Sequence, residues 1–255
     1  MPKFTLEELL EATGGQLRQA PTGVRINGVS IDSRTILPGE VFIALRGERF
    51  DGHDFLAAAV DRGATTLVVE QEIPLASFPG VTVIVVPDTL KALGGLARYH
   101  RQRYPIPLIG ITGSNGKTTT KELIAAVLAE KINVIKTEKN YNNEIGLPLS
   151  LLRIDDTTQA AVLEMGMRGR GEIAYLAGLA KPTIGVITNV GVSHIELLGS
   201  REAIAEAKAE LIEALPADGT AVLNYDDPLV ARMADAFPGE SLFYSLQAVD
   251  EKKSP

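Results

Sequence analysis

From residue 106 onward, short apolar segments alternate regularly with segments of helical pattern. The apolar segments read IPLIGIT, INVIK, AAVLEM, TIGVITN and TAVLN. Apolar runs of this length are typical of strands that are buried on both faces of a sheet. Their alternation with helices predicts a parallel sheet with helices on both faces, joined by right-handed crossovers. Functional residues are expected where these strands end, because ligands bind at the carboxyl edge of such sheets.

The segment before this sheet is predicted to form a small α/β domain of its own. Thr5 and Glu8 have the spacing of a capping box, and Gly14 is expected to end the helix that they begin. Strands are expected at 24–32, 41–45, 65–70 and 81–86, and a helix at 53–64. This pattern places a first domain at residues 1–87.

The second domain is expected to span residues 88–255. Asp88 follows a proline and can cap a helix that runs to about Tyr104. The polar stretch at the end, after residue 249, is expected to be a frayed tail.

Composition and charge exclude several classes of protein. The 255-residue chain has no cysteine, so neither a disulfide framework nor a cysteine metal site is possible. Acidic residues interrupt the first fifteen positions, which therefore do not form a signal peptide, and no apolar run approaches the ~20 residues of a membrane helix. The net charge of −7 argues against a nucleic-acid partner. We expect a cytoplasmic protein without membrane insertion.

The loop TGSNGKTTT, residues 112–120, joins the first of the strands to a helix and is called the phosphate loop below. Its small residues let backbone N–H groups converge on a phosphate at the helix N-terminus. Lys117 would reach the β and γ phosphates, and the Thr118 hydroxyl would bind Mg²⁺. The alternative is a glycine-rich turn with an exposed lysine, and Ile111 stands where the usual pattern has its first glycine. The nucleotide-binding residues expected here are Thr112, Gly113, Ser114, Asn115, Gly116, Lys117, Thr118 and Thr119.

Two further candidates follow strand ends. Glu164 ends the segment AAVLE, and a carboxylate beside a phosphate loop can hold the Mg²⁺ of a nucleotide. The alternative is a carboxylate that merely turns to solvent. His194 follows the strand that ends at Asn189 and is placed for a metal or a phosphate, although a single loop histidine more often has no such role. His100 lies in a charged helical stretch and is expected to be solvated.

Lys208 lies in the middle of an apolar helical stripe that contains Ile204, Leu211 and Leu215. Two interpretations are equally open. The lysine can extend outward along its stem or pair with a carboxylate. Alternatively, desolvation lowers its pKa and leaves a reactive amine. Such an amine can take up CO₂ and become a carbamate, which is an oxygen ligand for a second cation.

Together these residues resemble the Mur ligases, the ATP-dependent amide-forming enzymes of bacterial cell-wall synthesis. The segment TGSNGKT resembles their nucleotide signature, and Glu164 and His194 match the metal-binding Glu and His of the family. Lys208 lies fourteen positions beyond the histidine and matches the lysine that family members can carbamylate. The resemblance implies ATP and two Mg²⁺ ions as cofactors. It implies Lys117, His194 and Lys208 as catalytic residues, and Thr118, Glu164, His194 and Lys208 as metal ligands.

Four stretches, 32–55, 140–152, 171–191 and 194–210, resemble the family members that add D-alanyl-D-alanine to UDP-N-acetylmuramoyl-tripeptide. The resemblance implies a fold of class α/β, with a small N-terminal UDP-binding domain and a parallel-sheet ATP-binding domain of the P-loop type. Asn224 matches the adenine-side asparagine of the family. The substrate-binding residues implied are Ser33, Arg34, Gly47, Arg49, Asn142 and Asn143.

Family members carry a third, carboxy-terminal domain that closes over ATP. The chain ends where that domain should begin, so it is either a truncated form or a natural two-domain relative, and we expect it to bind ligands better than it turns them over. We also expect a monomer. The alternatives are the sister ligase that adds the third residue to the UDP-muramoyl dipeptide, a folylpolyglutamate synthetase-like ligase, and a non-catalytic nucleotide-binding module. The set of Lys117, Glu164, His194 and Lys208 favours an enzyme over the module.

Overall fold

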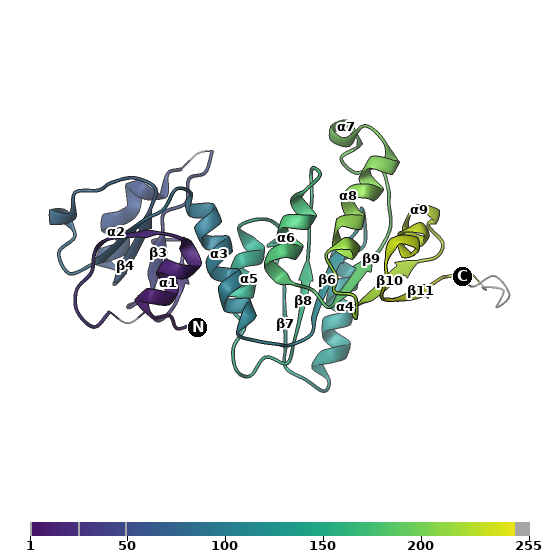
Figure 1. Ribbon diagram of the computed structural model, residues 1–255, viewed down its shortest axis with the longest axis horizontal. Helices are drawn as coiled ribbons and strands as arrows, with labels where there is room; N and C mark the ends of the chain where they lie inside the picture. Colours follow the sequence, from purple (N-terminus) through teal and green to yellow (C-terminus); the bar gives the residue numbers. More distant parts are fainter. Residues whose placement is uncertain (1, 25, 49, 248–255) are drawn as a thin grey trace. The chain divides into compact units, whose positions relative to one another are not determined.

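The computed structural model describes residues 2–24, 26–48 and 50–247 (Figure 1). Arg49, expected to bind substrate, and the expected frayed tail lie outside the described residues. The chain divides into two compact units, residues 1–104 with 151–155 and residues 105–150 with 156–255. Each unit has its own sheet.

In its described residues, the first unit contains five short strands and three helices. The strands are β1 (Gln16–Gln19), β2 (Val29–Ser30), β3 (Val41–Ile43), β4 (Thr66–Val69) and β5 (Thr82–Val85). The helices are α1 (Leu6–Thr13), α2 (Leu56–Asp61) and α3 (Thr89–Gln102), with 3₁₀ turns η1 (Gly52–Phe55) and η2 (Leu75–Ser77). The strand order is β1-β5-β4-β3-β2, and only β1 is antiparallel to its neighbour among these described strands. Strand β1 was not predicted from the sequence, because its residues, QLRQ, are polar.

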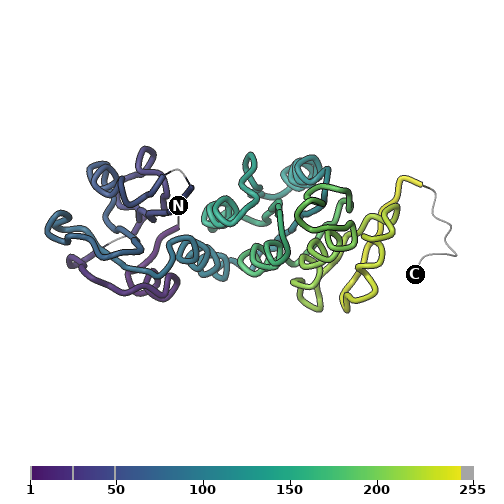
Figure 2. Tube along the Cα trace, turned by 90° about the horizontal axis from the view of Figure 1, so that it is seen from above, coloured from purple at the N-terminus to yellow at the C-terminus, as the bar shows by residue number. Residues whose placement is uncertain are grey.

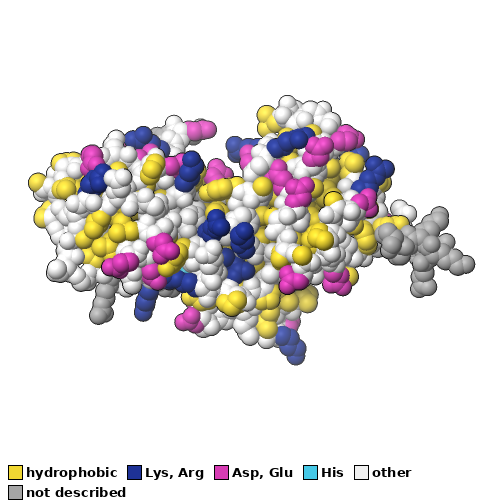
Figure 3. All heavy atoms as spheres, viewed as in Figure 1, with side chains coloured by type: hydrophobic (Ala, Val, Ile, Leu, Met, Phe, Trp, Pro, Cys, Tyr) yellow, Lys and Arg dark blue, Asp and Glu magenta, His cyan; other side chains and the backbone are white. Residues whose placement is uncertain are grey.

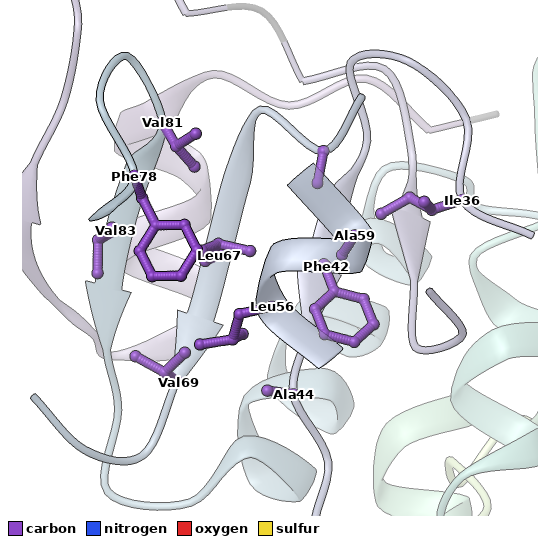
Figure 4. Packing of buried hydrophobic residues seen from close by; sticks show 11 residues of the cluster. Ile36, Phe42, Ala44, Leu56, Ala59, Leu67, Val69, Phe78, Val81 and Val83 are labelled. Atoms are coloured by element: carbon purple, nitrogen blue, oxygen red, sulfur yellow. The ribbon is translucent and has the colours of Figure 1, made fainter. Parts of the chain in front are cut away.

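The core of the first unit lies between α2 and one face of the sheet (Figure 4). Phe42, Leu56 and Leu67 are at most 5% exposed. Burial of one such side chain stabilises a fold by roughly 1.5–3 kcal/mol, which explains why strands of three or four residues persist here.

Helix α3 belongs to the first unit, so the domain boundary expected at residues 87–88 is displaced to Tyr104. Asp88 caps this helix as expected. The helix packs closely against α1: a Cβ at Gly95 would lie 2.3 Å from the Ala12 carbonyl oxygen. The sequence shows where α3 begins, but not that α1 provides its packing partner.

The prediction of a solvated His100 was wrong. Its residue is 1% exposed, and its ring packs near Phe4, with 5.8 Å between the ring centroids. Its Nε2 lies 2.8 Å from the Ile154 carbonyl oxygen. Burial lowers the pKa of His100 and so favours the neutral imidazole.

The second unit confirms the predicted parallel sheet with helices on both faces (Figure 2). Its strands are β6 (Leu108–Thr112), β7 (Val134–Lys136), β8 (Ala160–Glu164), β9 (Ile184–Ile187), β10 (Thr220–Asn224) and β11 (Glu240–Tyr244). Its helices are α4 (Lys117–Ala129), α5 (Gly146–Leu151), α6 (Glu172–Ala180), α7 (Ile195–Leu198), α8 (Arg201–Glu213) and α9 (Pro228–Ala231), with the 3₁₀ turn η3 (Arg232–Ala236). Strand β11 was not predicted from the sequence; it is an edge strand whose residues alternate between exposed and half-buried.

The strand order β11-β10-β9-β6-β8-β7 places β6 in the middle of this sheet. The chain reaches β7 and β8 on one side of β6 and then crosses to β9 on the other side. The carboxyl ends of β6, β8 and β9 therefore meet at a switch point, where α/β sheets bind ligands.

The surface of the molecule is mixed in charge. On the face drawn in Figure 3, acidic and basic side chains are interspersed. Among the described helices, none has the length and apolar character needed to cross a membrane.

The capping box at the start of α1 is confirmed and allows a test of local stability. The Thr5 hydroxyl accepts from the Glu8 N–H at 3.2 Å, and the Glu8 carboxylate accepts from the Thr5 N–H at 2.8 Å. Thr5→Ala should lower the free energy of unfolding of the first unit by about 1 kcal/mol. Urea denaturation followed by circular dichroism measures the loss. Thr22→Ala, in an exposed turn, is the matched control, and an equal effect of both changes would contradict the prediction.

Candidate functional site

The phosphate loop is tied to the loop that follows β9. The Ser114 N–H donates to the Asn189 carbonyl at 3.0 Å, and the Ser114 hydroxyl accepts from the Gly191 N–H at 2.8 Å. The Asn115 N–H donates to the Asn189 side-chain oxygen at 3.0 Å. The Thr188 hydroxyl donates to the Asn115 carbonyl at 2.7 Å. These hydrogen bonds fix the phosphate loop against the loop that follows β9.

Four backbone N–H groups remain free at the start of α4. Those of Gly116, Lys117, Thr118 and Thr119 have no acceptor within the described part of the chain. Free N–H groups at a helix N-terminus, together with the helix dipole, favour an anion. The amides of Ser114 and Asn115, also expected to serve a phosphate, instead donate within the protein.

Glu164 is a buried carboxylate next to the phosphate loop. Its residue is 3% exposed. One carboxylate oxygen accepts from the Thr118 hydroxyl, and the other accepts from the Asn142 amide, both at 2.9 Å. No Lys or Arg among the described residues forms an ion pair with it. A buried carboxylate with only uncharged partners is costly, and a bound cation would offset that cost.

Lys208 is desolvated in α8. Its residue is 2% exposed, and in the described ranges its ammonium has neither an ion-pair partner nor a hydrogen-bond partner. Burial, and secondly the charge of Lys117, lower the pKa of Lys208 to about 8. The structure therefore favours the desolvated amine over the outward-extended or paired lysine.

The Lys117 ammonium itself folds back onto the phosphate loop and donates to the Gly113 carbonyl at 2.7 Å. It also lines a cavity of about 780 Å³ beside Asn142, Asn143 and His194. His194 has a positive φ of 64°, a backbone strain that is often found at functional sites. The structure thus brings Lys117, the asparagine pair and His194 to one cavity.

Two cavity-lining residues were missed from the sequence. Arg168 and Arg170 line the same cavity, and both follow β8 at its carboxyl end. Their place after a strand that ends in Glu164 was the available signal. Around this site, the described residues contain no group of three or more His, Asp or Glu side chains that could hold a metal by themselves.

Asn224 is the last residue of β10, and its side chain bonds to the chain just after β9. Its amide donates to the Thr188 carbonyl at 2.9 Å, and its oxygen accepts from the Asp226 N–H at 3.0 Å. A contact of Asn224 with adenine stays a prediction.

The remaining candidates lie in the first unit. Ser33 is buried, and Arg34 is exposed. The Arg34 guanidinium makes two hydrogen bonds to Asp32, at 2.9 and 2.7 Å, and these bonds lower the pKa of Asp32 to about 2. The Gly47 N–H donates to the Phe50 carbonyl at 2.9 Å in a tight turn. Their role toward a uridine diphosphate stays a prediction.

Both units match models of one protein family. The model of the Mur ligase family, catalytic domain, matches residues 25–101, and the model of the Mur ligase middle domain matches residues 111–253. The chain belongs to the Mur ligase family.

Several relatives within the Mur ligase family carry the same name. The UDP-N-acetylmuramoyl-tripeptide–D-alanyl-D-alanine ligase of Synechocystis is 48% identical over 248 residues, covering 97% of this chain and 54% of the relative. The crystal structure of MurF from Acinetobacter baumannii has a TM-score of 0.87 at 34% identity and covers 96% of this chain and 53% of that one. The crystal structure of MurF from Thermotoga maritima in complex with ADP has a TM-score of 0.80 at 35% identity. It covers 87% of this chain and 51% of that one. The chain thus spans about half the length of the curated relatives it matches.

Gly113 in the phosphate loop of this Mur ligase chain should tolerate no side chain. It has a φ of 149°, and a Cβ there would lie 1.8 Å from the Thr188 hydroxyl oxygen. Gly113→Ala should lower the free energy of unfolding by about 2–4 kcal/mol, from backbone strain and the overlap with Thr188. Gly178→Ala is the control: a Cβ there meets nothing within 4 Å. In α6 that change should stabilise by about 0.5–1 kcal/mol. The urea concentration at the midpoint of unfolding should therefore fall for Gly113→Ala and rise for Gly178→Ala, relative to the wild type.

Lys208 should lower the free energy of unfolding at neutral pH, compared with an apolar side chain at the same position. At pH 7 the amine is protonated in both the folded and the unfolded state, and only the folded state bears the desolvation cost. Lys208→Met should therefore raise the free energy of unfolding by about 1–3 kcal/mol in CO₂-free buffer. Between pH 8, the folded-state pKa, and pH 10.5, the ordinary value, the folded state of the wild type loses this proton first. The wild type then gains stability with rising pH, and the difference shrinks. A less stable Lys208→Met at pH 7 would contradict the prediction.

Proposed function

We propose that this chain carries the substrate-binding and ATP-binding parts of a ligase that adds D-alanyl-D-alanine to UDP-N-acetylmuramoyl-tripeptide. The observation that carries the proposal is the cavity lined by Lys117, His194 and Asn142. Asn142 also donates to Glu164, which the Thr118 hydroxyl contacts. The names of the relatives support these substrates. In this proposal the first unit holds the UDP end of the substrate, and the second unit binds ATP. A cytoplasmic location follows from the use of ATP and a UDP-linked precursor.

The reaction joins a carboxylate to an amine at the expense of ATP. The terminal carboxylate of the tripeptide attacks the γ-phosphorus, the bond to the bridging oxygen breaks, and ADP leaves. The amine of D-alanyl-D-alanine then attacks the carbonyl of the acyl phosphate. The tetrahedral intermediate collapses to an amide, phosphate leaves, and the amine loses a proton.

Two anions must approach each other in the first step, so positive charge has to be fixed around them. Lys117 provides one charge, and the free N–H groups of Gly116 to Thr119 provide oriented dipoles. Arg168 also lines the cavity and would add positive charge there, whereas the charge of Arg170 is compensated by an ion pair with Glu206.

The residues present fit Mg²⁺. Glu164 is a buried carboxylate without a cationic partner, and the Thr118 hydroxyl contacts it, so these two would hold one ion. His194 and a carbamylated Lys208 would hold the second. A lysine with a pKa of about 8 is neutral in about a tenth of molecules at pH 7, and that fraction can react with CO₂. When bound, Mg²⁺ would neutralise charge on the phosphate oxygens.

The nearest alternative is the ligase that adds the third residue. A solved UDP-N-acetylmuramoyl-L-alanyl-D-glutamate–2,6-diaminopimelate ligase has a TM-score of only 0.57 at 26% identity. The higher similarity to the MurF structures supports the later step.

Calorimetry with two substrates tests the proposal. The purified chain should bind UDP-N-acetylmuramoyl-tripeptide at least tenfold more tightly than the dipeptide form, because the third residue adds contacts of about 1–3 kcal/mol. Equal affinity would favour the ligase that adds the third residue. Absence of binding to either substrate would overturn the proposal for this chain.

A nucleotide titration provides the second arm of the test. Lys117→Ala should weaken binding of a non-hydrolysable ATP analogue at least tenfold, because one charge-assisted contact is lost. Lys131→Ala, an exposed lysine beyond the end of α4, is the control and should leave the affinity unchanged.

A further inference from the structure

Lys121 is a buried lysine that the proposed chemistry does not use. It lies in α4, one helical turn after Thr118, and its residue is 1% exposed. Burying an ammonium costs free energy unless its donors find acceptors. The Lys121 Nζ donates to the Thr137 carbonyl at 2.8 Å and lies 3.1 Å from a carboxylate oxygen of Glu122.

The acceptor begins the segment 137–145, which joins β7 to α5 and carries the asparagine pair of the cavity. Thr137 is 0% exposed. Its hydroxyl accepts from the Glu164 N–H at 2.9 Å, and its own N–H donates to the Val162 carbonyl at 3.1 Å. The segment is therefore attached to β8 by its main chain and to α4 through Lys121.

These hydrogen bonds connect α4, β8 and the segment 137–145 in a closed network at the carboxyl edge of the sheet. Thr118 and Lys121 project from α4: Thr118 contacts the carboxylate of Glu164, and Lys121 contacts Thr137. Glu164 and Thr137 are bonded to each other. Asn142, farther along the segment, donates to the second carboxylate oxygen. The position of the segment is thus defined relative to the helix that begins at the phosphate loop.

We propose that Lys121 is a positioning residue, which holds the segment 137–145 so that Asn142 and Asn143 line the cavity that would receive the substrate peptide. This inference rests on the proposed function for its substrate. A long side chain with a terminal donor reaches the Thr137 carbonyl, whereas an apolar side chain leaves that buried oxygen without a partner.

Glu122, the ion-pair partner of Lys121, is not expected to hold the segment 137–145. Its side chain is 48% exposed, and it lies between Lys121 and Lys136. Exposed ion pairs contribute little to stability. Glu122→Gln therefore removes the ion pairs while the hydrogen bond from Lys121 to Thr137 persists, which makes this change a matched control.

Hydrogen exchange and ligand affinity test the proposal together. In Lys121→Met, amides of the segment 137–145 should exchange about tenfold faster, while β8 and the far end of α4 stay protected. The affinity for UDP-N-acetylmuramoyl-tripeptide should fall about tenfold, and that for the ATP analogue should stay within about threefold. Glu122→Gln should show neither change.

Chemical rescue separates positioning from a general effect on folding. The chain has no cysteine, so Lys121→Cys offers a single thiol. Alkylation of the denatured protein with 2-bromoethylamine, followed by refolding, restores an ammonium on a side chain of nearly the same length. Alkylation with iodoacetamide adds a neutral group instead. The aminoethylated protein should recover both the protection of the segment and the affinity for the tripeptide substrate, and the carbamidomethylated protein should recover neither.

Unchanged exchange in the segment of Lys121→Met would overturn the proposal. So would an equal effect of Glu122→Gln, an equal loss of nucleotide affinity, or equal recovery with the two alkylating reagents. If the wild-type chain binds neither ligand, the proposed function fails. The exchange rates of the segment then still decide whether Lys121 positions it.

Discussion

Glu164 brings a carboxylate into the interior at the end of β8, where the described partners of its oxygens are a hydroxyl and an amide. The carboxyl edge of the sheet is arranged around this charge. The hydroxyl comes from the helix that follows the phosphate loop, and the amide comes from the segment after β7. Because β8 lies next to β6 in the sheet, these parts meet without long connections. The carboxylate is stabilised by hydrogen bonds but not neutralised, and it is therefore suited to a cation that arrives with a ligand.

Two lysines at the same edge also lack a carboxylate partner among the described residues. Lys117 donates to a carbonyl of its own loop, and Lys208 is buried near it with a lowered pKa. The charge of Lys117 disfavours that of Lys208, and the four free N–H groups at the start of α4 add further positive potential at this edge. This electrostatic imbalance reduces stability in the free protein, and under the proposed function it would favour binding of a phosphate and a carboxylate, a common arrangement in functional sites.

Local signals predicted much of the fold and of the site. The capping box, the cap of α3, the parallel sheet and the phosphate loop could be predicted because each depends on residues that are close in sequence. Glu164 and His194 were candidates because ligands gather where parallel strands end. The structure places Glu164 in contact with Thr118 and His194 at the cavity, and their roles stay predictions. The edge strands β1 and β11 were missed, since strands at an edge need no continuous apolar run. The buried state of His100, the place of α3 in the first unit and the acceptor of Lys121 depend on contacts between distant residues, which no local pattern contains.

The hydrogen bonds from the loop after β9 to Ser114 and Asn115 also bear on the rate of association. A loop that orders only around its ligand loses conformational entropy at that moment, and its association waits for the rare open or ordered form. Here the donors stand in place beforehand, and the cost of ordering them was met when the sheet folded. Under the proposed function, a nucleotide would meet a loop whose main chain is already ordered, and the Lys117 ammonium would exchange the Gly113 carbonyl for a phosphate oxygen. Diffusion and charge, more than reordering of the loop backbone, would then set the rate of association.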